Sequence, residues 1–205
     1  MEPGLSSELR APGSGLDAPL ILASASPRRR ELLTLLGIPF EAVSTDVEEL
    51  TEGDPAELVV ANAVAKARAG RELTAAGPGE RIVVGVDTEV ELDGAVLGKP
   101  ADGAGAERRL RGLSGRTHEV LSGVAVIGPS GERTGLERTL VSFRDLAEHE
   151  IAAYVGSGEW RDRAGGYAVQ GLGSALVARV DGDLSNVIGL PIPLLSGMIT
   201  ALQDG

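Results

Sequence analysis

The chain has 205 residues, of which 42% are hydrophobic and only 2% aromatic, so its core must be built mainly from Val, Leu, Ile and Ala. Its 30 acidic residues outnumber the 19 basic ones, and the net charge of −11 argues against stable binding of a nucleic-acid backbone. Because the chain has no cysteine, disulfides, thiolate metal sites and a cysteine nucleophile are excluded.

The first 18 residues are rich in Pro, Gly and Ser and lack the apolar segment of a signal peptide. We predict a disordered N-terminal extension over residues 1–18 and a single domain over residues 19–205. No stretch approaches the roughly 20 apolar residues that span a bilayer, so we expect a cytoplasmic protein that does not bind membranes.

The first elements read as a strand, a tight loop and a helix. Residues 19–24 form a short apolar run typical of a buried strand, and residues 26–37 predict a helix. Ser26 is the expected N-cap, followed by Pro at the first helical position, and Gly37 is the expected stop. Residues 39–46 predict a second strand.

A capping box at residues 54–57 opens a predicted Ala-rich helix over residues 57–73. Residues 81–87 give the clearest strand pattern in the chain, and residues 89–98 predict a hairpin around Asp93-Gly94. The further predictions are helices at 104–115, 146–158 and 191–203, strands at 117–128 and 132–143, and loop and strand at 165–183. Because hairpins interrupt the alternation of strands and helices, we expect an α/β domain with a mixed sheet.

Three consecutive arginines, Arg28, Arg29 and Arg30, occupy the first turn of the helix at 26–37, where the helix dipole disfavours positive charge. A bound anion, with phosphate as the obvious candidate, would remove this conflict. At about 100° per residue, Arg28 and Arg29 project onto the face that we expect to be buried, whereas Arg30 projects onto the solvent side. That buried face is formed by Leu32, Leu33, Leu35 and Leu36. The alternative, in which all three arginines are merely solvated, stays open.

Acidic residues follow two predicted strands. Asp87 ends the strand at 81–87, and Asp46, Glu48 and Glu49 follow the strand at 39–46. Catalytic residues of α/β folds gather at the carboxyl ends of strands, and one or two carboxylates with substrate phosphates commonly hold Mg²⁺. For each acid alone a surface turn is the alternative, and for Glu48 we favour it.

Lys66 and Lys99, the chain's two lysines, follow these acidic segments and are further candidates for an anion site. Gln170 lies in a Gly-rich segment that lacks the spacing of a P-loop or a dinucleotide fingerprint. Its amide offers a donor and an acceptor, as reading a base edge requires. His118 and His149 have no ligand spacing, and we assign them no role.

Taken in order, these segments resemble the Maf family of nucleoside triphosphate pyrophosphatases. The segments that carry the resemblance are LASASPRRRELLTLLGIPFE, DVEE at 46–49, AVAKA around Lys66, GVDTEVELDGAVLGKPAD, LSGRTHEVLSGVAV, AGGYAVQGLG and NVIGLPIPLL. Together they cover residues from about 20 to 195. The resemblance implies a two-lobed α/β fold of the Maf and ITPase type, with an elongated mixed sheet and a central cleft. It also suggests a homodimer.

The resemblance further implies cleavage between the α and β phosphates of dTTP or UTP, with Mg²⁺ as the divalent metal and Mn²⁺ or Co²⁺ as alternatives. Asp87 would be the proton acceptor, and Asp87 and Glu49 would be the metal-binding carboxylates. The residues that would hold the triphosphate are Ser24, Arg28, Arg29, Lys66 and Lys99. The residues that match family positions for the choice of nucleotide base are Arg28, Thr88 and Gln170.

Three features depart from the family pattern: Glu89, where an apolar residue is usual; Arg163, where Lys is typical; and the N-terminal extension. Glu89 would either weaken nucleotide binding or face solvent in the hairpin. Two other functions stay open. One is a nucleotide-binding regulator of septum formation without significant turnover, and the other is removal of purine analogues such as ITP.

Overall fold

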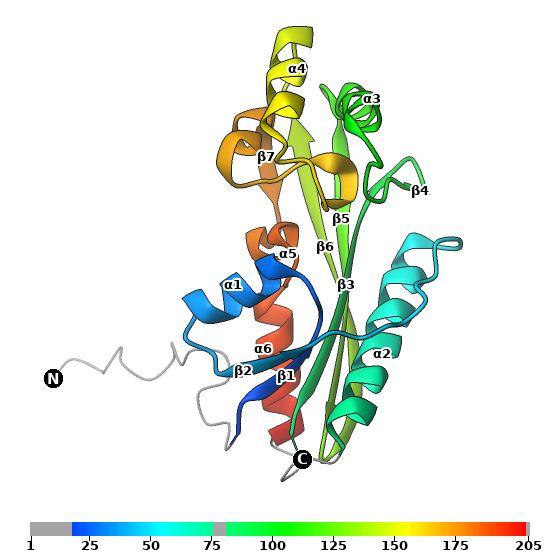
Figure 1. Ribbon diagram of the computed structural model, residues 1–205, viewed down its shortest axis with the longest axis vertical. Coiled ribbons are helices and arrows are strands. Elements are labelled where there is room, and N and C mark those ends of the chain that lie inside the picture. Colours follow the sequence, from blue (N-terminus) through cyan, green and yellow to red (C-terminus); the bar gives the residue numbers. More distant parts are fainter. Residues whose placement is uncertain (1–17, 76–80, 204–205) are drawn as a thin grey trace, which may run out of the picture.

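The computed structural model describes residues 18–75 and 81–203, and within them seven strands form one mixed sheet of order β2-β1-β3-β5-β6-β7, with β4 paired to β3 (Figure 1). The strands are β1 (Leu20–Ala23), β2 (Phe40–Val43), β3 (Val83–Leu92), β4 (Ala95–Val96), β5 (Thr117–Gly128), β6 (Gly131–Phe143) and β7 (Val177–Asp181). The helices are α1 (Pro27–Leu35), α2 (Pro55–Thr74), α3 (Gly103–Leu113), α4 (Glu148–Ser157), α5 (Leu184–Ile188) and α6 (Ile192–Gln203), with 3-10 turns η1 (Ala164–Gly166) and η2 (Gly171–Leu176).

The predicted extension falls on residues 1–17, which lie outside the described part, and on exposed Ala18. No helix of the described ranges has the length and apolarity to cross a membrane.

The predicted two-lobed architecture is confirmed, because the long strands β3, β5 and β6 run through two separate packing regions (Figure 1). In the lower lobe, α1 and α6 pack on one face of the sheet around Leu33, Val86 and Leu195, while α2 covers the other face. In the upper lobe, α3 and α4 pack around Leu110 and Ile151. Each lobe therefore has its own core on a shared set of strands.

The prediction for the strand that contains Asp87 is wrong at the carboxyl end of that strand. The predicted strand 81–87 does not end at Asp87, because β3 continues to Leu92 and also forms the first arm of the hairpin at Asp93-Gly94. It is the neighbouring strand β1 that ends, since its pairing with β3 stops at the Ala23–Gly85 pair. Between Gly85 and Glu91, no described strand pairs with this edge of β3. Asp87 thus lies in the middle of a strand, beside a gap in the sheet.

Helix α1 begins at Pro27, directly after Ser26, as predicted, although the Ser26 side chain makes no capping hydrogen bond. The prediction that Leu35 belongs to the buried face is wrong, because its exposed fraction is 82%. At 100° per residue Leu35 lies about 120° around the helix from buried Arg29, and only one side of this nine-residue helix faces the sheet. The buried side of the helix is therefore the one that Arg29 shares with Leu33, as predicted for Arg29, and Leu35 lies outside it.

Helix α2 contacts the sheet through backbone atoms. A Cβ added at Gly85 of β3 would lie 2.6 Å from the Ala67 nitrogen, and one added at Gly123 of β5 would lie 2.5 Å from the Val60 nitrogen. Both distances are shorter than any real Cβ contact, so only glycine permits this approach. The predicted N-cap is confirmed, since the Asp54 side chain accepts hydrogen bonds from two backbone nitrogens of the first turn.

The core of the upper lobe contains a cluster of three rings from distant segments. His118 of β5 contacts Phe143 and Tyr167 edge-on, with ring centroids 5.2 and 5.3 Å away. Its Nε2 lies 2.7 Å from the Tyr167 hydroxyl, with which it forms a hydrogen bond. Burial lowers the pKa of His118 to about 4, so the ring is neutral near pH 7. Its sequence context, which has no ligand spacing, did not indicate this position.

We predict that Gly85→Ala lowers the free energy of unfolding by about 3 kcal/mol, because the added Cβ meets the backbone of α2 and the helix must move away from the sheet. Gly112→Ala is the matched control, since a Cβ at this exposed position of α3 meets no atom within 4 Å. We expect it to be neutral or to stabilise by about 0.5 kcal/mol. Urea unfolding measures both effects, and equal effects would contradict the close packing of α2.

We predict that His118 makes the protein less stable as the pH falls below about 6.5. The folded state keeps the ring neutral down to pH 4, whereas the unfolded chain binds a proton near pH 6.5, so protons favour unfolding in this window. Between pH 7.5 and 5 this costs about 2 kcal/mol. Urea unfolding gives the free energies of unfolding of the wild type and of His118→Gln. We expect the difference between these two free energies to be about 2 kcal/mol smaller at pH 5 than at pH 7.5. A difference that is constant with pH would contradict the assignment.

Candidate active site

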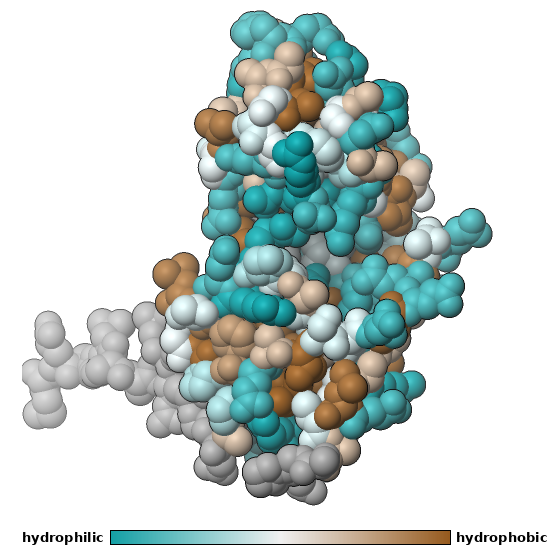
Figure 2. Space-filling view, viewed as in Figure 1, coloured by the Kyte–Doolittle hydropathy of each residue, from teal (hydrophilic) through white to brown (hydrophobic). Residues whose placement is uncertain are grey.

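The gap beside β3 opens into a cavity of about 470 Å³ between the two lobes, and hydrophilic side chains gather around this waist of the molecule (Figure 2). The cationic side chains that line it are Arg28, Arg29, Lys66, Lys99, Arg161 and Arg163. The acidic side chains that line it are Glu49, Asp87, Glu89 and Asp162. Cations thus outnumber acids in the cavity of a chain whose net charge is −11, which indicates a site for an anionic ligand.

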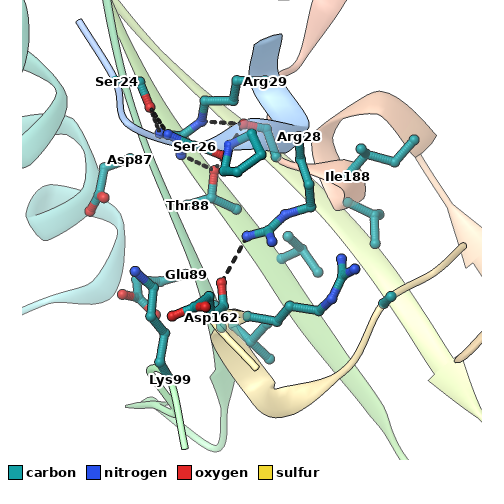
Figure 3. A pocket seen from close by; sticks show the side chains of 18 of the residues that line it. Ser24, Ser26, Arg28, Arg29, Asp87, Thr88, Glu89, Lys99, Asp162 and Ile188 are labelled. Carbon is teal, nitrogen blue, oxygen red and sulfur yellow. Dashed lines mark hydrogen bonds between the residues drawn. The ribbon is translucent and has the colours of Figure 1, made fainter. Parts of the chain in front are cut away.

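Arg29 is buried, with an exposed fraction of 8%, and its guanidinium group reaches three separate segments (Figure 3). It donates to the Gly189 carbonyl at 2.7 Å, to Ser24 Oγ at 2.9 Å and to Thr88 Oγ1 at 3.1 Å. Burial lowers its pKa to about 10, which leaves it charged near pH 7. All three acceptors are neutral oxygens, so within residues 18–75 and 81–203 the buried charge is hydrogen-bonded but has no counter-ion in direct contact.

The other two arginines of the triplet separate as predicted. Arg28 lines the cavity and donates to the Asp162 carbonyl at 2.9 Å, which links α1 to the upper lobe (Figure 3). Its pKa is lowered, first by burial and then by the nearby charge of Arg163. Arg30 is exposed and lies outside the cavity lining, and its longest-range contact is a 3.4 Å hydrogen bond to the Ser24 carbonyl.

Lys66 of α2 lies between two carboxylates of the cavity. Its Nζ is 2.6 Å from Glu49 Oε1 and 2.6 Å from Asp87 Oδ1. Asn62, one turn earlier on α2, donates to Asp87 Oδ2 at 2.9 Å. The same amide exchanges hydrogen bonds with the backbone of Leu50, at 2.8 and 3.1 Å. Asn62 therefore holds Asp87 and the segment of Glu49 together.

The structure does not bring the rest of the acidic run into the site. Asp46 and Glu48 are exposed and do not line the cavity, so only Glu49 of the three acids after β2 approaches Asp87. The surface position favoured for Glu48 is confirmed. A strand leaves the sheet in an extended segment whose successive side chains point in different directions, which explains why neighbours in sequence separate here.

Glu89 does not face solvent in the hairpin, because it lines the cavity on the same strand as Asp87 (Figure 3). Its Oε2 is buried and has no hydrogen-bond partner in the described residues. Burial raises its pKa to about 7, and the charges of Asp87 and Glu49 add to this effect. Arg163, the second departure, also lines the cavity and donates through Nε to the Glu159 carbonyl at 2.5 Å.

The predicted base-site residues approach the cavity from both lobes. Thr88 Oγ1 lies 2.8 Å from Ser122 Oγ on β5, in addition to its contact with Arg29. Gln170 is exposed at the cavity wall, in the loop between η1 and η2, and Lys99 is exposed at the end of the hairpin. The cavity therefore brings together the nine residues expected to form the site, although their roles stay predictions.

Sequence reasoning missed several residues of the site. The Gly189 carbonyl is an acceptor for Arg29 that no side-chain pattern reveals. Arg161, which lines the cavity and stacks on Trp160 at 4.8 Å, stands in the charged segment EWRDR at 159–163, where no spacing marks it as a ligand-binding residue. The spacing of Asn62 and Lys66, four residues apart on one helix face, was the one available signal for the support of Asp87.

The chain is similar to known proteins over most of its length. The family described as Maf-like protein matches residues 19–202. A relative from Deinococcus radiodurans named dTTP/UTP pyrophosphatase is 50% identical over 86% of this chain and 89% of its own. Proteins of the same name from Symbiobacterium thermophilum and Bacillus cereus strain AH820 are 48% and 46% identical, over 88% and 86% of this chain and 92% and 91% of their own.

Among solved structures, a nucleoside-triphosphatase described as a dITP/XTP pyrophosphatase from Mycobacterium abscessus is 23% identical. Its match covers 62% of this chain and 75% of its own, with a TM-score of 0.39. The family match, over residues 19–202, therefore includes both lobes and all the residues that line the cavity between them. The chain belongs to the Maf family.

Proposed function

We propose that this protein is a nucleoside triphosphate pyrophosphatase that hydrolyses dTTP and UTP to the monophosphate and pyrophosphate. The observation that carries the proposal is the cavity between the lobes, which combines a buried Arg29 that donates to neutral oxygens with the Lys66-Asp87-Glu49 cluster. Relatives that are 46–50% identical over most of the chain are named for this activity. The cytoplasmic location and the homodimer expected from the sequence remain parts of the proposal.

In this proposal Asp87 and Glu49 also hold a divalent cation, with Mg²⁺ expected and Mn²⁺ or Co²⁺ as alternatives. The donors fit, because the two carboxylates are close enough to share one ammonium group, that of Lys66. No group of three or more His, Cys, Asp or Glu side chains in the described residues forms a complete metal site. Mg²⁺ commonly uses one or two carboxylates and takes its other ligands from water and phosphates. When bound, it neutralises charge on the phosphates.

Asp87 is the proposed general base, which accepts the proton of the attacking water. Its position is suited to this role because Lys66 and Asn62 hold its two oxygens from one helix. Phosphoryl chemistry depends mainly on orientation and on cations around the transferred group. Ser24, Arg28, Arg29, Lys66 and Lys99 would provide these contacts to the triphosphate.

This proposal also explains why α1 begins with positive charge. The first-turn amides and Arg28 and Arg29 would donate to the same phosphate oxygens, and the substrate would supply the missing counter-ion of Arg29. Arg28, Thr88 and Gln170 would choose the base. Glu89 would oppose the triphosphate when ionised, because it adds negative charge to the same cavity.

We predict that Asp87→Asn lowers pyrophosphate release from dTTP by at least about a hundredfold, since the proton acceptor is lost while the shape of the side chain is kept. Asp46→Asn is the matched control, because Asp46 belongs to the nearby acidic run but is exposed outside the cavity. A coupled assay of pyrophosphate with Mg²⁺ measures both. Full turnover by Asp87→Asn would exclude this base.

The pyrophosphate assay and a binding measurement together distinguish the proposed enzyme from the two alternative functions. Calorimetry with the α,β-methylene analogue of dTTP should show that Asp87→Asn still binds nucleotide. A wild type that binds this analogue but releases no pyrophosphate from any nucleoside triphosphate would favour the regulator of septum formation. Faster turnover of ITP than of dTTP and UTP would favour removal of purine analogues.

We predict that Arg29→Ala and Arg30→Ala differ sharply, although the residues are adjacent. Arg29→Ala should lower kcat/KM for dTTP by about a hundredfold, because it removes charge-assisted donors from a buried site. Arg30→Ala should change it by less than about twofold, as expected for an exposed charge. Circular dichroism confirms that both variants fold. Equal losses of activity would contradict the division of the triplet.

A further inference from the structure

The side chain of Gln170 makes no hydrogen bond to the described residues, so the loop that carries it decides where its amide lies. After this residue the loop is held by Glu159, whose carboxylate accepts the backbone N–H groups of Leu172 and Gly173 at 3.0 and 3.2 Å. Before it, the Ala168 N–H donates to the Tyr154 hydroxyl at 3.0 Å. Gln170 is therefore held between two anchored points of one short loop.

The anchor on the cavity side is Tyr167, three residues before Gln170. Its ring packs edge-on against Phe143 and His118, with centroids 4.8 and 5.3 Å away, and its hydroxyl forms the 2.7 Å hydrogen bond with His118. Tyr167 lines the cavity, whereas His118 is 2% exposed and does not line it. His118 therefore cannot contact a nucleotide directly and acts on the cavity only through Tyr167.

Strand β5 connects this anchor to the other residue proposed for base choice. His118 and Ser122 are four residues apart on β5, so their side chains emerge from the same face of the strand. Ser122 bonds Thr88, its register partner on β3, and His118 bonds Tyr167 of the Gln170 loop. One strand face thus sets the separation between Thr88 and Gln170.

We propose that His118 is a positioning residue for base choice, because its hydrogen bond to Tyr167 holds the loop of Gln170 in place relative to Thr88. This inference rests on the proposed function and extends it to a residue outside the cavity. It requires that His118 affects the choice between nucleotides more than the rate of the reaction.

The test compares kcat/KM for dTTP with kcat/KM for GTP in variants that break the hydrogen bond. Tyr167→Phe removes only the hydroxyl, and His118→Leu removes the ring nitrogen. We expect each to lower the dTTP to GTP ratio by about threefold to tenfold, the range for loss of one hydrogen bond, with kcat for dTTP little changed. His118→Gln, whose amide can approach the position of Nε2, should restore much of the ratio.

Two further comparisons separate positioning from general destabilisation. Ser130→Ala removes a hydroxyl that donates to the Leu202 carbonyl at the far end of the sheet, so it should lower stability without changing the ratio. In a Gln170→Ala background, His118→Leu should have no further effect on the ratio, because the residue through which it acts is gone. An undiminished effect there would overturn the inference.

Binding measurements keep this inference separate from the proposed function. Calorimetry with the α,β-methylene analogues of dTTP and GTP gives the same ratio without turnover. If the wild type releases no pyrophosphate, the proposed function fails and the binding ratio still tests His118. A wild type without pyrimidine preference in either measurement, or folded His118→Leu and Tyr167→Phe variants with unchanged ratios, would overturn the inference.

Discussion

The direct backbone contact between α2 and the sheet is the constraint on which the site depends. Gly85 and Gly123 let the helix approach β3 and β5 more closely than any side chain would allow. At that distance the Lys66 ammonium reaches both Asp87 and Glu49, and Asn62 reaches the second oxygen of Asp87. A side chain at either glycine would push the helix away from the sheet and separate these charges. Two glycines that have no chemical role of their own therefore determine the geometry of the charged residues.

The second constraint is the gap in the sheet beside β3. A continuous sheet would hide Asp87 and Thr88 on opposite faces, because successive side chains of a strand alternate. Where β1 has ended and β4 has not yet begun, the edge of β3 is open, and neighbouring residues from both faces line one cavity. The two lobes share long strands across this gap, so a ligand can contact both of them on one framework.

Charge links the fold to its proposed chemistry. A guanidinium group as buried as that of Arg29 is costly unless its hydrogen bonds are satisfied, and here three neutral oxygens satisfy them without neutralising the charge. Two carboxylates of the cavity, those of Asp87 and Glu49, lie by contrast on the side of α2, where they share the Lys66 ammonium group. This separation of an anion-binding side from a carboxylate side is what metal-assisted phosphoryl transfer needs.

The sequence by itself determined the local elements and their chemistry: the strand, loop and helix around the arginine triplet, the cap at Asp54, the turn at Asp93-Gly94 and the residues that resemble the Maf pattern. These depend on contacts within a few residues. Only the tertiary structure decided that β3 continues past Asp87, that Leu35 is exposed, and that His118 bonds Tyr167. The partners in these contacts are far apart in the chain, as with Arg29 and the Gly189 carbonyl, 160 residues away, and local periodicity carries no information about them.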